Sequence, residues 1–180
     1  MRLLLPLLEL YLPGPLKKKV LADLFSLTAQ AFGVIPPPIR GMSYLAALEA
    51  YALFTQREAE RVLQEENDSE VIKRCLYDNA RLLGKRLREK LRLRSAEDVL
   101  RTSKLLYKIL GISFEGRTDG RVTIARCYFS RFYTNRICGL ISALDAGVAA
   151  GLSRGGKLDF YQKLTEGRDS CKARIVWDGD

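Results

Sequence analysis

The sequence predicts an α+β fold in which N-terminal helices pack on a C-terminal antiparallel sheet of β-β-α-β-β order. Apolar residues recur every three or four positions through about residue 110, which is the period of a helix. After Gly111 the pattern alternates, and aromatic and β-branched residues become frequent, which is typical of strands. Because 47% of the 180 residues are hydrophobic, we expect a single domain over 1–180, with a helical part at 1–110 and the β-β-α-β-β part at 111–180.

Proline, glycine and capping residues set the bounds of four expected helices. Pro15 lies near the start of the first helix, and Gly33 ends it. Ser43 can cap a second helix that runs to about Gln64. A third helix begins at 67–70, and a fourth begins with a capping box at 95–98 and ends at Gly111.

Strands are expected near 112–116, 121–130, 157–164 and 171–177, with a helix from about Thr134 to Leu152 between the two pairs. The last strand would place Cys171, Ala173, Ile175 and Trp177 on one face. In the second strand, Cys127 would share a face with Phe129.

The segment from Thr134 to Leu152 is apolar nearly all round, so we expect a buried helix. Its glycines and alanines would let the backbone approach the sheet or a twin helix closely. Asp145 interrupts this pattern and lies seven residues after Cys138, on the same helix face. Facing inward, its carboxylate would need an arginine, a metal or a raised pKa; the alternative is a solvated strip.

Cys127, Cys138 and Cys171 converge in the expected fold, with Asp145 or Glu166 as oxygen donors nearby. Zinc prefers four ligands of this soft kind, but the sequence has no C-x-x-C spacing. Buried free cysteines that behave as small hydrophobic side chains explain the pattern better. We therefore expect no metal ligands and no certain cofactor, and zinc is disfavoured.

Composition narrows the classes of function. The chain has no histidine, which excludes Ser-His-Asp and Cys-His catalytic pairs and histidine-ligated metals. Four cysteines are too few for a disulfide framework, so a cytoplasmic location is expected. No apolar run is expected to be long enough to span a membrane, and residues 1–12 resemble a packed arm more than a secretion signal.

Basic charge is concentrated in one segment. The net charge is +9, and residues 81–94 hold seven Lys and Arg against Glu89 alone. Such a basic amphipathic helix is usually a solvated face, and no nucleic-acid-binding motif accompanies it. Nucleic acid is therefore disfavoured as a partner.

Residues 122–177 resemble the small-molecule-binding domain named for bacteriochlorophyll 4-vinyl reductase, and the related domain of L-2-amino-thiazoline-4-carboxylic acid hydrolases. The matching features are a cysteine that opens a Gly/Ala-rich helix (138–152), then a strand (158–164), then the run 167–171 before an alternating strand. The resemblance implies an α+β ligand-binding domain, often dimeric. Some relatives bind zinc, but two of the four matching positions here are Phe160 and Lys163, which cannot serve as those ligands.

Three hypotheses of function follow. The first is a module that binds a small organic ligand between the 134–152 helix and the sheet, with Tyr128, Phe129 and Phe160 as lining residues. The second is a hydrolase of a small cyclic substrate, with Asp145 as acid or base and the thiols of Cys138 and Cys171. The third is a homodimeric assembly subunit that uses residues 1–12 and the small-residue helix for contacts.

Overall fold

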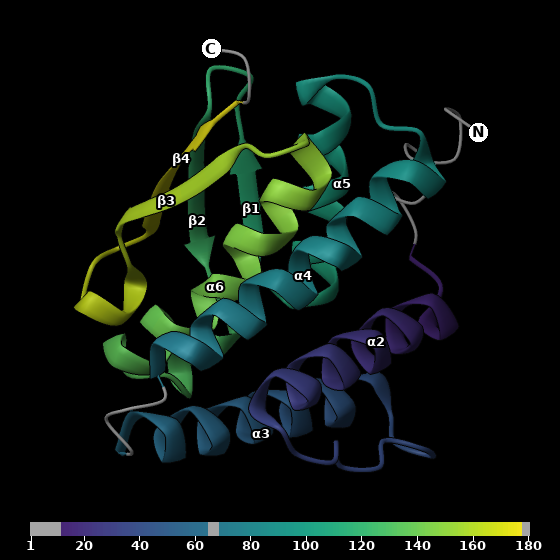
Figure 1. The fold of residues 1–180 in the computed structure, drawn as a ribbon, viewed down its shortest axis with the longest axis vertical. Helices are drawn as coiled ribbons and strands as arrows, with labels where there is room; N and C mark the ends of the chain where they lie inside the picture. Colours follow the sequence, from purple (N-terminus) through teal and green to yellow (C-terminus); the bar gives the residue numbers. More distant parts are fainter. Residues whose placement is uncertain (1–11, 65–68, 178–180) are drawn as a thin grey trace.

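The computed structural model describes residues 12–64 and 69–177, and it confirms the α+β fold (Figure 1). The elements follow in the order α2 (Gly14–Phe32), α3 (Tyr44–Gln64), α4 (Ser69–Leu91), α5 (Ala96–Ile109), β1 (Ser113–Gly116), β2 (Arg121–Arg126), α6 (Asn135–Ser153), β3 (Lys157–Gln162) and β4 (Cys171–Val176). Two short 3-10 helices lie at Tyr128–Arg131 and Leu164–Glu166.

The β-β-α-β-β order describes the chain and not the sheet. In space the four strands lie in the order β1-β2-β4-β3, and all neighbours are antiparallel. On one face the side chains are buried, and on the other they are exposed, as the alternation predicts. Val122, Ala173 and Ile175 belong to the buried face, which the helices cover.

The second and third strands are shorter than the sequence predicts. β4 begins at Cys171 opposite Ile124, so the chain beyond Ile124 loses this neighbour and β2 ends at Arg126. Residues 128–131 then form a 3-10 turn, in which the Ser130 hydroxyl donates to the Cys127 carbonyl oxygen at 2.8 Å. The prediction that Cys127 and Phe129 share a strand face is therefore wrong.

The helix boundaries agree closely with the predicted signals. Gly33 adopts φ +68°, which ends α2 in the left-handed conformation that glycine tolerates. The Ser43 hydroxyl accepts a hydrogen bond from the Ala46 amide at 3.1 Å, and Ser95 forms the expected capping box with Asp98 before α5. Thr134 caps α6 by accepting from the Ile137 amide at 3.3 Å.

α6 lies between α4 and the sheet, and its glycines allow backbone contact with α4 (Figure 1). A Cβ atom at Gly147 would lie 2.3 Å from the Tyr77 carbonyl oxygen, and one at Gly151 would lie 2.3 Å from the Arg81 carbonyl oxygen. Gly84 of α4 approaches Val148 in the same way. The close partner is thus another helix of the same chain, and not the sheet or a twin helix. These glycines are accordingly not free for the expected homodimer contact.

α6 also corrects the expectation about membrane-spanning length. The helix has 19 residues, and an 18-residue window of it has a mean hydropathy of 1.3, so by length and composition alone it could cross a bilayer. Half of that stretch is buried inside the protein. Packing between α4 and the sheet accounts for the apolar composition without a membrane. The expected arm at residues 1–12 lies outside the described residues except for the buried Leu12.

Candidate functional site

A cavity of about 130 Å³ lies between α5, α6 and the sheet, and residues of α2, α3 and α4 complete its wall. Most of its wall is apolar, and the lining residues include Leu24, Leu106, Ile112, Ile141, Leu144 and Val148. An engineered protein cavity of about 150 Å³ with a similar aliphatic and aromatic wall stays dry and binds benzene. The cavity is therefore suited to a compact apolar ligand, or to a short length of a longer one.

Asp145 is the acidic residue in this wall. Protein surrounds its carboxyl, but the residue also lines the cavity. Part of its surface therefore stays accessible. Its Oδ1 accepts a hydrogen bond from the Tyr107 hydroxyl at 2.8 Å, and Oδ2 has no hydrogen-bond partner among the residues that the structure describes. Burial raises the pKa of Asp145 to about 6, against the opposing effects of the Tyr107 hydrogen bond and the Lys163 charge. The carboxyl faces inward, as one of the two sequence-based alternatives proposed.

Two of the three sulfurs expected near Asp145 line the cavity. Cys127 and Cys138 are part of the wall, whereas Cys171 is buried beside it and its Sγ accepts from the Leu164 amide at 3.3 Å. Burial raises the pKa of Cys127 to about 12, and burial also raises the pKa values of Cys138 and Cys171. The thiolate, which is the reactive form, is therefore scarce at neutral pH at all three positions.

Three tyrosines complete the polar part of the site, and sequence reasoning did not identify them. Tyr51 of α3 and Tyr133 line the cavity together with Tyr107 of α5. The Tyr51 hydroxyl pairs with Thr28 at 2.9 Å, and the Tyr133 hydroxyl pairs with Thr55, so each hydroxyl already has one partner within the fold. Burial raises the pKa of Tyr107 and that of Tyr133, which keeps both phenols neutral. A tyrosine on the apolar stripe of an amphipathic helix is the signal that marks such a residue.

The three aromatic residues expected to line the cavity behave differently. Phe129 is buried and forms part of the wall. Tyr128 does not, because its ring lies under the Arg131 guanidinium, 4.1 Å from centroid to Cζ, and beside Gly111. Phe160 is half-buried at the outer strand β3, where it packs on the sheet core and does not reach the cavity. Because β2 ends at Arg126, Tyr128 lies outside the strand. Its side chain therefore does not follow the alternating pattern from which the prediction was made.

The candidate metal ligands of the sequence do not form a cluster in the described part of the chain. Residues 12–64 and 69–177 contain no group of three or more Cys, Asp and Glu side chains that could hold a metal ion. Glu166, which was considered as an oxygen donor, instead accepts from the Lys163 amide at 2.9 Å.

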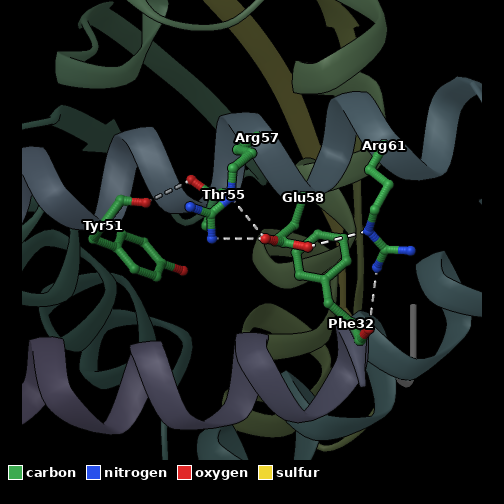
Figure 2. A network of polar contacts seen from close by, with 6 residues as sticks. All are labelled: Phe32, Tyr51, Thr55, Arg57, Glu58 and Arg61. Carbon is green, nitrogen blue, oxygen red and sulfur yellow. Dashed lines mark hydrogen bonds and ion pairs between the residues drawn. The ribbon is translucent and has the colours of Figure 1, made fainter. Parts of the chain in front are cut away.

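A second buried polar cluster lies on α3, and its contacts are structural (Figure 2). Glu58 is 6% exposed and accepts hydrogen bonds from Arg57 at 2.9 Å and from Arg61 at 3.2 Å. Arg61 also donates to the Phe32 carbonyl oxygen at 3.4 Å, which joins α3 to the end of α2. Because these partners satisfy the carboxylate, the cluster ties two helices together and faces no cavity.

The basic segment forms one wall of an open groove between α4 and α6. Arg81, Lys85 and Arg88 line it together with Arg154, which follows α6. Arg88 donates to the Gly151 carbonyl oxygen at 3.1 Å, near the end of α6. Cations near the carboxyl end of a helix are stabilised by its dipole, which accounts for much of this cluster within the fold.

Comparisons with known proteins inform the fold alone. No family model matches the chain, and no curated protein matches it. Among solved structures, the chain is similar to the trafficking protein particle complex subunit 3 from Naegleria fowleri, crystallised covalently bound to palmitic acid. The two share 15% identity and a TM-score of 0.51, over 72% of this chain and 95% of that one. The resemblance to the 4-vinyl reductase domain stays a prediction.

Proposed function

We propose that this protein binds a small, largely apolar ligand in the cavity between α6, α5 and the sheet. The observation that carries the proposal is the cavity itself, a hollow of about 130 Å³ with an almost wholly apolar wall. Apolar atoms that leave water for such a site gain about 25 cal/mol per Å² of buried surface. A pre-formed hollow avoids much of the cost of opening the core for the ligand.

The palmitic acid bound to the structural neighbour makes an acyl chain one ligand class worth testing. A cavity of this volume holds only part of such a chain unless the walls open. Covalent attachment would need a thiolate, and the raised pKa values of Cys127 and Cys138 disfavour it. The proposal is therefore non-covalent binding of a compact ligand.

Thermal unfolding with and without toluene tests the proposal. A ligand at 100 times its dissociation constant should stabilise the native state by about 2.7 kcal/mol. The Ala149→Leu variant should lose this response, because Ala149 lines the cavity and the larger side chain fills it. No stabilisation of the wild type, or an unchanged response in the variant, would contradict the proposal. Native mass spectrometry of the same samples reports any covalent acyl adduct.

A hydrolase is the second candidate, and the position of Asp145 favours it. A carboxyl with a pKa of about 6 inside an apolar cavity has the properties of a general acid or base. The roles expected for Cys138 and Cys171 receive no such support, since burial keeps both thiols protonated. Turnover of 2-amino-thiazoline-4-carboxylate by the wild type and its loss in Asp145→Asn, with the variant still folded by circular dichroism, would support this candidate.

A further inference from the structure

The cavity contains a polar atom that the fold does not use. Oδ1 of Asp145 accepts from Tyr107, while Oδ2 has no partner among the described residues and borders the hollow. Asp145 keeps some accessible surface, so a ligand that donates to Oδ2 can take the place of water there, and next to an apolar wall a hydrogen bond to a charged oxygen is of the stronger kind.

The other polar groups of the wall are neutral hydroxyls, which are weaker acceptors than a carboxylate. The Tyr51 and Tyr133 hydroxyls are paired with threonines, and the Ser142 hydroxyl donates to the Gly139 carbonyl oxygen at 3.0 Å. The Ser103 hydroxyl lines the cavity without a hydrogen bond to a described residue, but it is neutral and can serve as donor or acceptor. The carboxylate of Asp145 can only accept, so it alone imposes a direction on the hydrogen bond.

We propose that the cavity selects a compact apolar ligand with one N–H or O–H donor, which binds the free carboxylate oxygen of Asp145. This inference rests on the proposed function and adds the polarity of the ligand to it. It also implies that a ligand with a free carboxylate is rejected, because its charge would meet the charge of Asp145 in a largely apolar site, and this argues against the carboxylate substrate of the hydrolase candidate.

Calorimetric titration with isosteric probes tests the inference. Toluene, aniline and phenol have the same size and differ only in a methyl, amino or hydroxyl group on the ring. At pH 8 we expect aniline and phenol to bind about tenfold more tightly than toluene, since hydrogen bonds to charged groups are the stronger kind. Pyridine, which only accepts, should bind more weakly than the two donors.

Two variants separate the role of the carboxylate from that of the cavity. Asp145→Asn keeps the shape but presents an amide, so the advantage of aniline and phenol should fall below about threefold and pyridine should gain. Ser103→Ala, the matched control in the same wall, should keep the wild-type ranking. If Asp145→Asn does not fold, the ranking in the wild type still decides the matter.

The outcomes separate the two proposals. If toluene binds and the donors bind no more tightly, the inference about Asp145 is overturned and the apolar site stands. If none of the four probes binds, the proposed function fails and the inference fails with it. An unchanged donor preference in Asp145→Asn would also overturn the inference.

Discussion

The two faces of α6 pack in opposite ways, one in close contact with α4 and the other beside a cavity. Toward α4 the helix presents glycines, and the two helices approach so closely that a methyl group at Gly147 would lie 2.3 Å from a carbonyl oxygen. Toward α5 and the sheet it presents Ile141, Leu144 and Asp145, and there a hollow of about 130 Å³ remains. Ile141 and Leu144 thus border the hollow, whereas Gly147 and Gly151 form the close contact with α4.

This contrast indicates that the hollow is a feature of the fold and not a sign of loose packing. Protein interiors are packed nearly as densely as organic crystals, and the contacts of Gly147 and Gly151 with α4 are of this close kind. A void on the other side of the same helix forgoes dispersion contacts and is costly. A void that remains beside a buried acidic residue is typical of a ligand-binding site.

The largest effect on stability should come from adding a side chain where α6 contacts α4. Gly147→Val would place a side chain against the Tyr77 carbonyl oxygen, so we expect a loss of about 3 kcal/mol or more in the free energy of unfolding. Gly139→Ala on the same helix is the control, because its Cβ would meet only the Lys163 Nζ, at 3.8 Å. Urea denaturation should show no loss there, since alanine favours a helix over glycine. Equal destabilisation by both changes would contradict the described packing.

The second-largest effect on stability concerns Asp145, which lines the cavity. Folding raises the pKa of Asp145 from 3.8 to about 6, so the native state binds the proton more tightly than the unfolded state does. This stabilisation is fully present below pH 4 and is lost as the pH rises through 6. Relative to Asp145→Asn, the wild type should therefore lose about 2 kcal/mol of unfolding free energy between pH 4 and pH 7.

Comparison with Asp145→Asn removes the contributions of other titrating groups that the two proteins share. Tyr107 of α5, Lys163 before the second 3-10 helix, and the thiols of Cys127, Cys138 and Cys171 surround the carboxyl, and none of the thiols ionises in this range. A pH-independent difference between the two proteins would show that Asp145 is solvated.

Neighbouring alanines offer a sharper comparison of the two sides. Ala149 lines the cavity, whereas Ala150 is 2% exposed and lies by the groove toward α4. Ala149→Leu should stabilise the fold by about 1 kcal/mol as it fills the hollow, and Ala150→Leu should destabilise it by about 1 to 3 kcal/mol. Thermal unfolding of the two variants provides the measurement, and the same sign for both would argue against an open side.

The smallest effect concerns thiol reactivity. Cys127 and Cys138 line the hollow, while Cys75 of α4 does not. We expect slow alkylation of the native protein by iodoacetamide at pH 7.5, because burial keeps the two cavity thiols protonated. Saturation with toluene should slow Cys127 and Cys138 further and leave Cys75 unchanged, as peptide mass mapping of the labelled protein can show. Protection of all three thiols alike would indicate a general stabilisation instead of an occupied cavity.

Local signals in the sequence predicted most of the fold. Gly33, Ser43, Ser95 and Thr134 determine where helices begin or end through interactions within a few residues, so their positions can be read directly. The end of β2 could not be read in this way, because it depends on where β4 stops pairing with it, almost fifty residues further along the chain.

Part of the candidate site was predicted because it depends on spacing along a single helix. The spacing of Cys138 and Asp145 on one helix face placed both at the cavity, and the helix period alone was sufficient. Tyr107 and Tyr51 were missed because their roles depend on helices that meet only in the folded chain. The approach of α6 to α4, and not to the sheet, likewise depends on tertiary contacts that no short pattern contains.

A crystal of the protein under xenon pressure tests the central claim most directly, because xenon enters apolar cavities and needs no polar partner. We expect a xenon atom in the hollow bordered by Phe129, Leu144 and Val148, with the α4 face of α6 unchanged. A cavity that excludes xenon, either because the walls have closed or because ordered water fills it, would contradict the account.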